Sequence, residues 1–370
     1  MHILRFTYTI VTISGCCRPQ SWTSLFKRTV YNIYSLYVIT MIYTFTILQI
    51  MDIILNVDNT DDFADNLNMM MTVLASCFKI FIACLNYDNI VALINYLTKE
   101  PFKPLDTNEM KIRQHYEKVI RNNTLRFIAL VTATGICVIS SSIFTDFRHK
   151  KLKYREWIPY NYSHHMIFCF TYIQQMLSVC HSAVVHIAID SLVCGFLMHI
   201  CCQIEILEYR LKKILSNQLT VGYCVWHHNL IFKYAQVVNI RFTKIVGLQF
   251  MTSTMTICCN LYQLSQSPLN TSSIGLIGLT CCMLTEIFIY CWFGHKMKSK
   301  SVQLVDSIFH IKWSTLTNNV KRNLLIIMKR AIVPIEFTTA HMIGLNLDSF
   351  VALLKTSYSA YNLLVRVREK

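Results

Sequence analysis

The stretch from Ile245 to Thr285, IVGLQFMTSTMTICCNLYQLSQSPLNTSSIGLIGLTCCMLT, runs for 41 residues without an Asp, Glu, Lys or Arg. A membrane-spanning helix needs roughly 20 apolar residues, so this stretch is long enough to cross a bilayer twice. The turn-forming segment SQSPLNTSS (Ser265–Ser273) divides it into two helices. The sequence therefore predicts an all-α integral membrane protein.

Apolar runs outside this stretch predict five further membrane helices. Of the 370 residues, 54% are hydrophobic and only 15% are charged, and the mean hydropathy of +0.39 is too high for a chain whose surface must meet water. With the pair already described, these runs give seven expected transmembrane helices. The other five are Thr29–Met51, Leu67–Tyr87, Phe127–Thr145, Met166–Ile189 and Ser349–Val365.

The basic residues predict which side of the membrane each loop faces. One set of alternate loops contains 25 Lys and Arg, and the other set contains eight. Because cytoplasmic loops carry the excess of basic residues, the N-terminus is expected inside the cell and the C-terminus outside. The basic set comprises residues 1–28, 88–126, 204–244 and 294–347, and the other set comprises 52–65, 146–165, 265–273 and 366–370.

Three N-x-S/T sequons bear on the same orientation. Asn161 and Asn270 lie in loops that the charge bias places outside, so both are predicted glycosylation sites. Asn122 lies in a loop assigned to the inside, next to the third helix, and is interpreted as a chance match.

The composition and the motifs exclude several other classes of protein. The formal net charge is +15, but the basic residues are spread through the cytoplasmic-type loops without an RNA- or DNA-binding motif, so no nucleic-acid partner is expected. The 16 Cys lie mostly in apolar runs and lack zinc-site spacings, so they are interpreted as small buried hydrophobes and no metal is expected. With no nucleotide loop and no catalytic constellation, neither an enzyme nor a cofactor is predicted.

Two segments near the C-terminus carry a resemblance. FIYCWFGHKMKSKSVQLVDSIFHIKWSTL (Phe288–Leu316) and LDSFVALLKTSYSAYNLL (Leu347–Leu364) resemble the closing segments of the insect odorant receptor family. The pair Ala340-His341 and the residue His295 depart from the family's usual Ala-Gly and acidic residue. The positions that match the family signature are Tyr290, Cys291, Trp292, Gly294, Ser301, Phe309 and Trp313.

The resemblance implies a ligand-gated, non-selective cation channel in the plasma membrane of olfactory sensory neurons. It also implies a tetramer with an obligate co-receptor, Orco, whose loop between helices 4 and 5 is longer than about Glu205–Lys244 here. The chain is thus identified as a ligand-tuning subunit. An inside N-terminus reverses the topology of a G-protein-coupled receptor, and the D-R-Y-like and N-P-x-x-Y motifs are missing, so no G protein is expected to be required.

The ligand implied by the family is a small volatile apolar odorant, for which an apolar and aromatic cavity with few polar groups is expected. By family analogy, the cavity lies in the outer half of the bundle, between helices 2, 3, 4 and 6 with help from helix 5. Met suits such a site because its thioether is flexible and polarizable. The residues that fall there are Met69, Met70, Val73, Leu74, Ile139, Ser142, Ile143, Phe168, Tyr172, Ile173, Gln175, Tyr262 and Thr280.

Assembly and gating residues are also implied by the resemblance. The inner ends of helices 4–6 and the first part of segment 7 are expected to form a cytoplasmic anchor, with Trp292, Gly294, Phe309 and Trp313 as assembly residues. The segment Leu304–Met328 is amphipathic and too charged to span a membrane, which agrees with this role. In helix 7, Leu363 and Val367 stand four residues apart on one face and are expected to close the pore as apolar rings.

Four charged residues inside the predicted spans need an explanation, because charge in a membrane is costly. Asp190 and Glu286 are expected to pair with Lys or Arg of the cytoplasmic loops. Lys79 is expected to extend toward the inner membrane surface. Lys355, in the most polar span, is expected to face another helix or a wet vestibule.

Two alternatives stay open on the sequence: a gustatory-type ligand-gated channel, and a secondary transporter, for which paired half-repeats would be required. The expected organisation has four parts. These are a cytoplasmic N-terminus (1–28), helices 1–4 with the ligand pocket (29–202), helices 5 and 6 with the anchor (203–347), and the pore-lining helix 7 with a short extracellular C-terminus (348–370).

Overall fold

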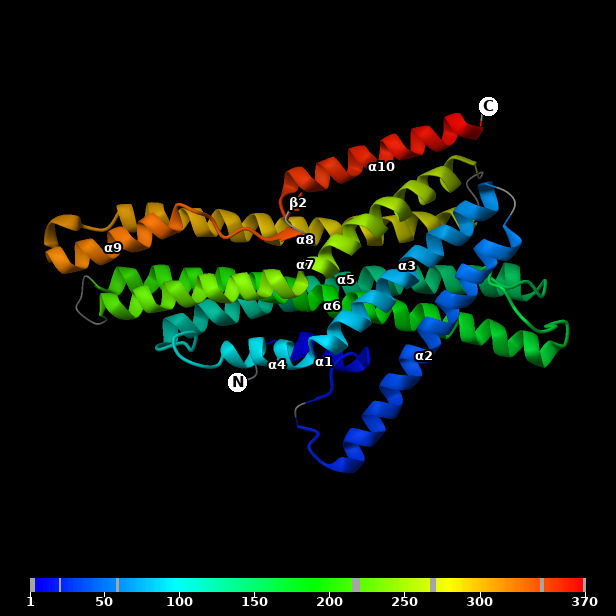
Figure 1. Ribbon diagram of the computed structural model, residues 1–370, viewed down its shortest axis with the longest axis horizontal. Helices are drawn as coiled ribbons and strands as arrows, with labels where there is room; N and C mark the ends of the chain where they lie inside the picture. Colours follow the sequence, from blue (N-terminus) through cyan, green and yellow to red (C-terminus); the bar gives the residue numbers. More distant parts are fainter. Residues whose placement is uncertain are drawn as a thin grey trace.

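The computed structural model describes residues 4–19, 21–57, 60–214, 220–266, 271–339 and 343–368 as an elongated bundle of long helices (Figure 1). In chain order its helices and strands are α1 (Arg5–Ile13), α2 (Leu25–Asn56), α3 (Thr60–Leu85), α4 (Tyr87–Tyr96), α5 (Thr107–Ser142), the π-helical turn η1 (Ile143–Phe147), α6 (His165–Lys213), α7 (Val221–Gln266), α8 (Thr271–Phe309), the 3₁₀ turn η3 (Trp313–Thr315), α9 (Asn318–Ala331), β1 (Thr338–Thr339), β2 (Ile343–Gly344) and α10 (Leu347–Arg368).

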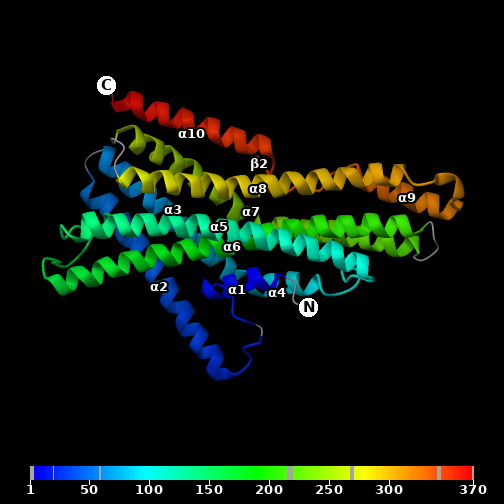
Figure 2. The same ribbon diagram turned by 180° about the vertical axis from the view of Figure 1, so that it is seen from behind.

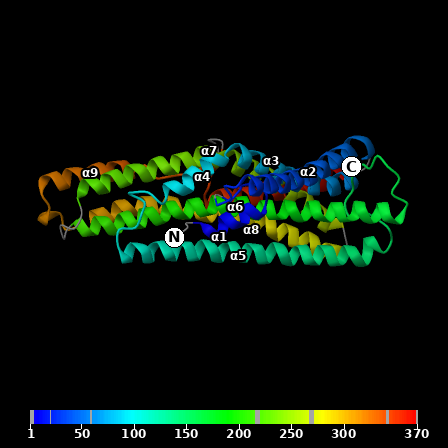
Figure 3. The same ribbon diagram turned by 90° about the horizontal axis from the view of Figure 1, so that it is seen from below.

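The helix α6 forms the centre of the bundle and contacts α1, α2, α3, α5, α7 and α8. All but one of its residues between Val185 and Leu207 are buried, so the helix is enclosed on every side rather than along one stripe. A helix that is apolar all round is expected in such a position. Figure 3 shows α5 and α6 extending along most of the length of the molecule.

The two ends of the bundle are built differently. One end carries α9 together with the C-terminal part of α8, the start of α7 and the end of α6, and at the other end α2 meets α3 (Figures 1 and 2). The helix α9 is amphipathic and buries Leu324, Ile327 and Ala331 against α7 and α8. We refer to these as the α9 end and the α2–α3 end.

Several helices extend well beyond their predicted apolar runs. The helix α5 begins at Thr107 instead of Phe127, capped by Asp106, whose carboxylate accepts the Glu109 backbone N–H at 2.7 Å. Within the stretch Glu205–Lys244, expected as a loop, residues 205–213 and 221–244 are helical. Hydropathy detects only the part of a helix that is apolar, whereas a charged helix that packs against its neighbours is equally stable in water.

Five described helices are long and apolar enough to cross a membrane. The helices α7 and α10 are not among them, although the sequence predicted a span in each. The chain is therefore an all-helical membrane protein with several candidate spans. The five are Leu25–Asn56, Asp62–Leu85, Thr107–Phe147, His165–Lys213 and Ser273–Phe309.

The helix α10 lies at the margin of the bundle, against α7 and α8 (Figure 1). A two-residue antiparallel pair, in which Thr338 faces Gly344, precedes it and fixes its start. Gly294 of α8 makes this approach possible, because a Cβ at that position would collide with the carbonyl oxygen of Leu345.

Candidate ligand cavity and buried ion cluster

An apolar cavity of about 130 Å³ lies between α3, α5, α6, α7 and α8, in the half of the bundle nearer the α2–α3 end. Its wall is mostly aliphatic, aromatic and sulfur-bearing, as a site for a small apolar molecule requires. Its lining residues include Met69 of α3, Val131 and Ile139 of α5, Met176 of α6 and Leu279 and Met283 of α8.

A second, more polar cavity of about 420 Å³ adjoins the first one. It is lined by Gln49, Asn66, Arg155 and Tyr262, among others, and it shares Asn68, Met69, Val138, Tyr154 and Leu279 with the apolar cavity. Residues common to both walls separate the two cavities, and we refer to the polar one as the vestibule.

The structure brings together only part of the predicted ligand set. Met69 and Ile139 line the apolar cavity, and Met69 and Tyr262 line the vestibule. Ile143 and Ile173 are 47% and 55% exposed and lie outside both cavities.

The other predicted ligand residues pack within the bundle and are absent from the lining of either cavity. Met70 packs with Leu67 and Cys259, and the Ser142 and Tyr172 hydroxyls are 2.8 Å apart. The remaining members are Val73, Phe168 and Thr280, which are buried, and Leu74, which is partly exposed.

Gln175 acts on the cavity through another residue. Its side chain accepts the Tyr154 backbone N–H at 3.4 Å and donates to the Tyr154 carbonyl at 2.9 Å. Tyr154 lies in the connection between η1 and α6 and lines both cavities. The predicted ligand residue therefore positions a wall residue that the sequence did not single out.

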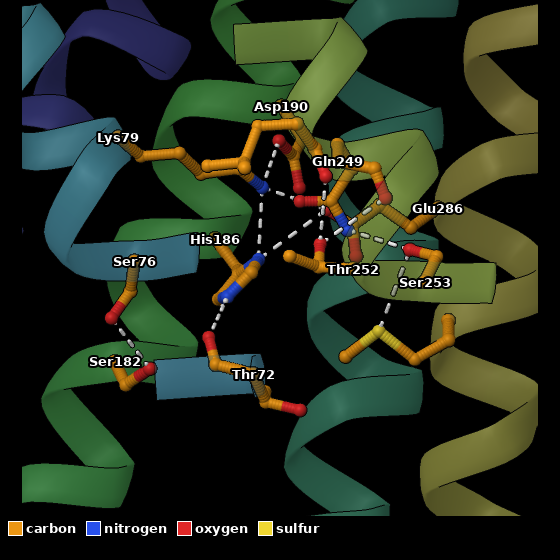
Figure 4. A network of polar contacts seen from close by, with 12 residues as sticks. Thr72, Ser76, Lys79, Ser182, His186, Asp190, Gln249, Thr252, Ser253 and Glu286 are labelled. Atoms are coloured by element: carbon orange, nitrogen blue, oxygen red, sulfur yellow. Dashed lines mark hydrogen bonds and ion pairs between the residues drawn. The ribbon is translucent and has the colours of Figure 1, made fainter. Parts of the chain in front are cut away.

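A buried ion cluster lies at the inner end of the apolar cavity. Figure 4 shows Lys79 of α3 reaching between His186 and Asp190 of α6 and Glu286 of α8. The Lys79 Nζ lies 2.6 Å from Asp190 Oδ1, 2.7 Å from Glu286 Oε1 and 2.8 Å from His186 Nδ1. His186 and Glu286 also line the cavity, so the cluster forms part of its wall.

The contacts fix the protonation of His186. A lysine ammonium has three protons and no acceptor, and these three contacts use all of them, so His186 Nδ1 is an acceptor. The proton of the neutral ring is then on Nε2, which donates to the Thr72 carbonyl at 3.0 Å. The Tyr290 hydroxyl adds a further donor, 2.7 Å from Asp190 Oδ1.

One atom of each of His186, Asp190 and Glu286 lies within 4.8 Å of the others, a geometry that a metal ion could use. The Lys79 ammonium contacts a ligand atom of all three residues and thus holds the place that a metal would take. The four residues comprise one cation, two carboxylates and a neutral imidazole ring.

This arrangement corrects the sequence interpretation of the buried charges. Asp190 and Glu286 pair with Lys79 and not with loop residues, and Lys79 points into the bundle instead of toward the membrane surface. One signal was available, because His186 and Asp190 stand four residues apart on one helical face. The contribution of Lys79 had no such signal, since its partners are 107 to 207 residues away.

Three of the four predicted assembly residues lie at or near the surface of the single chain, whereas Gly294 is buried against Leu345. Trp292 and Phe309 are 48% and 70% exposed, and the Trp313 indole N–H donates to the Phe309 carbonyl at 3.2 Å. Two other signature positions have internal roles: Tyr290 bonds Asp190, and the Ser301 hydroxyl accepts the Ile335 backbone N–H at 3.1 Å.

The predicted gate and glycan residues occupy different regions of the fold. Leu363 is 64% exposed on α10, and Val367 lies in the last turn of the same helix. Asn161 is exposed in the connection between η1 and α6, where its Oδ1 accepts the Ser163 backbone N–H at 2.9 Å. Asn270 falls outside the described residues.

These features define a helical membrane protein with an internal ligand cavity. The family described as 7tm Odorant receptor matches residues 59–358, so the chain belongs to the insect odorant receptor family, which confirms the sequence prediction. Members of this family are odorant-gated channels and not enzymes.

Named relatives agree with this assignment. Odorant receptor 46a of Drosophila melanogaster is 25% identical in its isoform A, over 74% of this chain and 76% of its own length. Isoform B is 22% identical over 96% of both chains. The solved structure of the olfactory receptor OR5 from Machilis hrabei in complex with eugenol has a TM-score of 0.87 at 16% identity, and the match covers 98% of this chain and 97% of that one. This last likeness shows that the fold is shared.

Proposed function

We propose that the chain is a ligand-tuning subunit of an odorant-gated, non-selective cation channel and binds a small, mostly apolar volatile in the cavity between α3, α5, α6, α7 and α8. The observation that carries the proposal is this largely apolar cavity, which adjoins a polar vestibule, within a chain of the odorant receptor family. The relative from Machilis hrabei was solved with eugenol, a small organic molecule, which supports a ligand of similar size here.

The pore is proposed to be lined by α10. This helix packs on α7 and α8 by one face, whereas Thr356, Ser359 and Leu363 are exposed at spacings of three and four residues on another. A polar stripe that ends in a leucine suits a water-filled pore closed by an apolar ring, with Val367 one turn further on. Leu363→Ser is then expected to raise current in the absence of odorant, recorded at matched surface level. An unchanged baseline and unchanged ion permeation would exclude Leu363 from the gate.

The proposed topology has seven spans, with the N-terminus in the cytoplasm and the C-terminus outside. The five candidate spans, α7 and α10 together give this number, and the 25-to-8 bias of basic residues supports the direction. The α9 end would then form the cytoplasmic anchor, with Trp292 and Phe309 exposed and Trp313 half-buried, for contact with other subunits. Antibody labelling of a tag fused after Lys370, on intact cells, tests this orientation.

The partner proposed for assembly is the co-receptor Orco, in a tetramer in the plasma membrane of olfactory sensory neurons. The four-part organisation of the chain, from the cytoplasmic segment 1–28 to the pore helix and outer C-terminus 348–370, is part of the same proposal. The exposed face of α10 and the exposed aromatic residues of the anchor support an assembly of several subunits around one pore.

Current recorded from cells that express the chain with Orco tests the function and the position of the site. A panel of volatile alcohols, amines, esters and hydrocarbons is expected to contain activators. Met69→Ala should raise their half-maximal concentrations by about ten- to a hundredfold, since a buried side chain of this size contributes about 1.5–3 kcal/mol. Met69 is 8% exposed and lines both cavities.

The matched control is Ile173→Ala, which removes an apolar side chain that is 55% exposed and lies outside both cavities. Its half-maximal concentrations should equal those of the wild type. If both variants leave every response unchanged at normal surface level, the ligand binds elsewhere. A lack of current with every volatile, despite normal surface level with Orco, would contradict the channel function.

A further inference from the structure

Glu286 gives the apolar cavity an acidic inner end. It is 3% exposed, it belongs to the ion cluster, and it is the carboxylate in the described lining of the cavity. Both Lys79 and His186 contact the same oxygen of Glu286, Oε1, at 2.7 and 3.3 Å. Because His186 Nδ1 carries no proton, only Lys79 donates a hydrogen bond to this oxygen, and a carboxylate can accept about four, so the capacity of Glu286 is not used up.

The charges of the cluster do not balance. Lys79 contributes one positive charge, Asp190 and Glu286 contribute two negative charges when ionised, and the Lys79 contact keeps His186 neutral. In the described part of the chain, Asp190 Oδ2 is buried without a hydrogen-bond partner. Buried negative charge in excess is costly, and since Glu286 lines the cavity whereas Asp190 does not, a donor that enters the cavity would be stabilised at Glu286.

A second polar group faces the same cavity. Thr256 of α7 is 2% exposed and lines the cavity, and its Oγ1 has no hydrogen-bond partner among the described residues. A buried hydroxyl without a partner destabilises a protein unless a ligand or water satisfies it. A hydroxyl accepts as well as donates, so Thr256 suits the same kind of ligand head group as Glu286.

From these observations we propose that the cavity selects odorants that combine an apolar body with one hydrogen-bond donor, a hydroxyl or an ammonium group, directed at Glu286. This inference rests on the proposed function and narrows its ligand class. An ester, ether or hydrocarbon has no proton to offer the carboxylate. An amine has an additional advantage, because its positive charge offsets the negative excess of the cluster.

Asp190 provides a matched control for Glu286. It belongs to the same cluster, but it lines only a void of about 20 Å³, which Glu286 also borders, and not the ligand cavity. Glu286→Gln and Asp190→Asn therefore remove the same charge from the same network. Only the first removes a carboxylate that a ligand in the cavity can reach.

The test records current from the chain with Orco for two series of probes that differ only in the head group. One series is phenethylamine, phenethyl alcohol and ethylbenzene, and the other is hexylamine, hexanol and hexane. Wild type is expected to respond to the amine and the alcohol at lower concentrations than to the hydrocarbon. In Glu286→Gln, the half-maximal concentration should rise about a hundredfold for the amines and about tenfold for the alcohols, whose hydroxyl can still donate to an amide oxygen. In Asp190→Asn the alcohols should stay within about twofold of wild type, and the amines, which lose only the excess charge and keep the Glu286 acceptor, should shift clearly less than in Glu286→Gln.

Three results would overturn the inference while the proposed function stands. The first is a wild type that responds only to the hydrocarbons or to esters. The others are half-maximal concentrations of amines and alcohols that Glu286→Gln does not change, or that Glu286→Gln and Asp190→Asn raise equally. Should Glu286→Gln fail to reach the surface, Glu286→Asp keeps the charge and shortens the side chain, and it must also weaken the donor responses. If no volatile of any class gives current at normal surface level, the proposed function itself fails.

Discussion

Two buried ion clusters hold the bundle together at different positions, and they differ in how completely their groups are paired. Lys79 lies beside the cavity. Arg210, toward the α9 end of α6, forms a two-point pair with Glu109 of α5, with Nε 2.9 Å from Oε1 and Nη2 2.7 Å from Oε2. Its remaining protons reach the carbonyl oxygens of Pro101 at 2.7 Å and Lys103 at 3.0 Å.

The last donor of Arg210 and the residue it contacts are paired as well. The Arg210 Nη1 is 3.1 Å from His227 Nδ1, and His227 Nε2 is 3.0 Å from Gln203 Oε1. Because Arg can only donate, His227 accepts at Nδ1 and donates from Nε2 as a neutral ring. One cation and one anion balance, with both charged groups at most 1% exposed.

The difference in pairing indicates that the Arg210 cluster supports the fold, whereas the Lys79 cluster can also recognise a ligand. The guanidinium of Arg210 has a planar set of donors, all directed at a carboxylate, at carbonyls or at His227, and the cluster faces neither the apolar cavity nor the vestibule. The Lys79 cluster has two carboxylates for one cation, and one of them, Glu286, lines the apolar cavity. A cluster that is complete in itself stabilises the fold, whereas an incomplete one has capacity left for a ligand.

The largest effect is expected from Arg210→Met. This change leaves Glu109 charged and buried without its partner, and it leaves the carbonyls of Pro101 and Lys103 unpaired, which should destabilise the protein by about 3–5 kcal/mol. Surface level, measured by cell-surface labelling, should fall at least tenfold, and all odorant responses should disappear together.

The control on the same helix is Lys212→Met. Its side chain is 62% exposed and pairs with Glu208 one turn away, a contact that contributes little. A normal surface level in Lys212→Met and a strong loss in Arg210→Met would support the comparison. Normal surface level and current in Arg210→Met would refute it.

A smaller effect is expected from Lys79→Met. Asp190 and Glu286 lose their cation, but Lys79 contacts only side chains, so no backbone carbonyl loses a donor, and surface level should fall by a few fold and less than in Arg210→Met. The triple variant Lys79→Met, Asp190→Asn, Glu286→Gln removes every charge and should recover most of the surface level.

A double variant at the Arg210 cluster tests whether removing both charges restores the surface level there too. Arg210→Met with Glu109→Gln also removes both charges, but the carbonyls of Pro101 and Lys103 still lack their donors, so it should recover little. If the two combined variants recover to the same extent, the clusters do not differ in the way proposed here.

Much of the fold was accessible from the sequence, because the properties that decide it are local. Five of the predicted apolar runs lie in helices that can span a membrane. The last expected span, Ser349–Val365, lies within α10, although that helix is too polar to be recognised as a span by composition. The polar extensions of α5 and α7 were missed, since a charged helix that packs on its neighbours has no hydropathy signal.

The candidate site was accessible only in part. Met69 and Ile139 were placed in the correct region by family analogy, but Tyr172 and Gln175 pack inside the bundle beside the cavity instead of lining it. Which face of a helix points into a cavity depends on how that helix is rotated against its neighbours. A single apolar run does not contain this information, because lipid, neighbouring helices and a ligand all favour the same side chains.

By itself, the sequence determined that this chain is a helical membrane protein of the odorant receptor family, because the length of apolar runs and the spacing of the C-terminal signature can be seen within short segments. Only the tertiary structure decided that Lys79, Asp190 and Glu286 form one cluster and that Glu286 closes the inner end of a cavity. These residues are 111 and 207 positions from Lys79, and side chains this far apart become neighbours only when helices pack side by side. The cost of burying a charge is local, but the partner that offsets it is set by the fold.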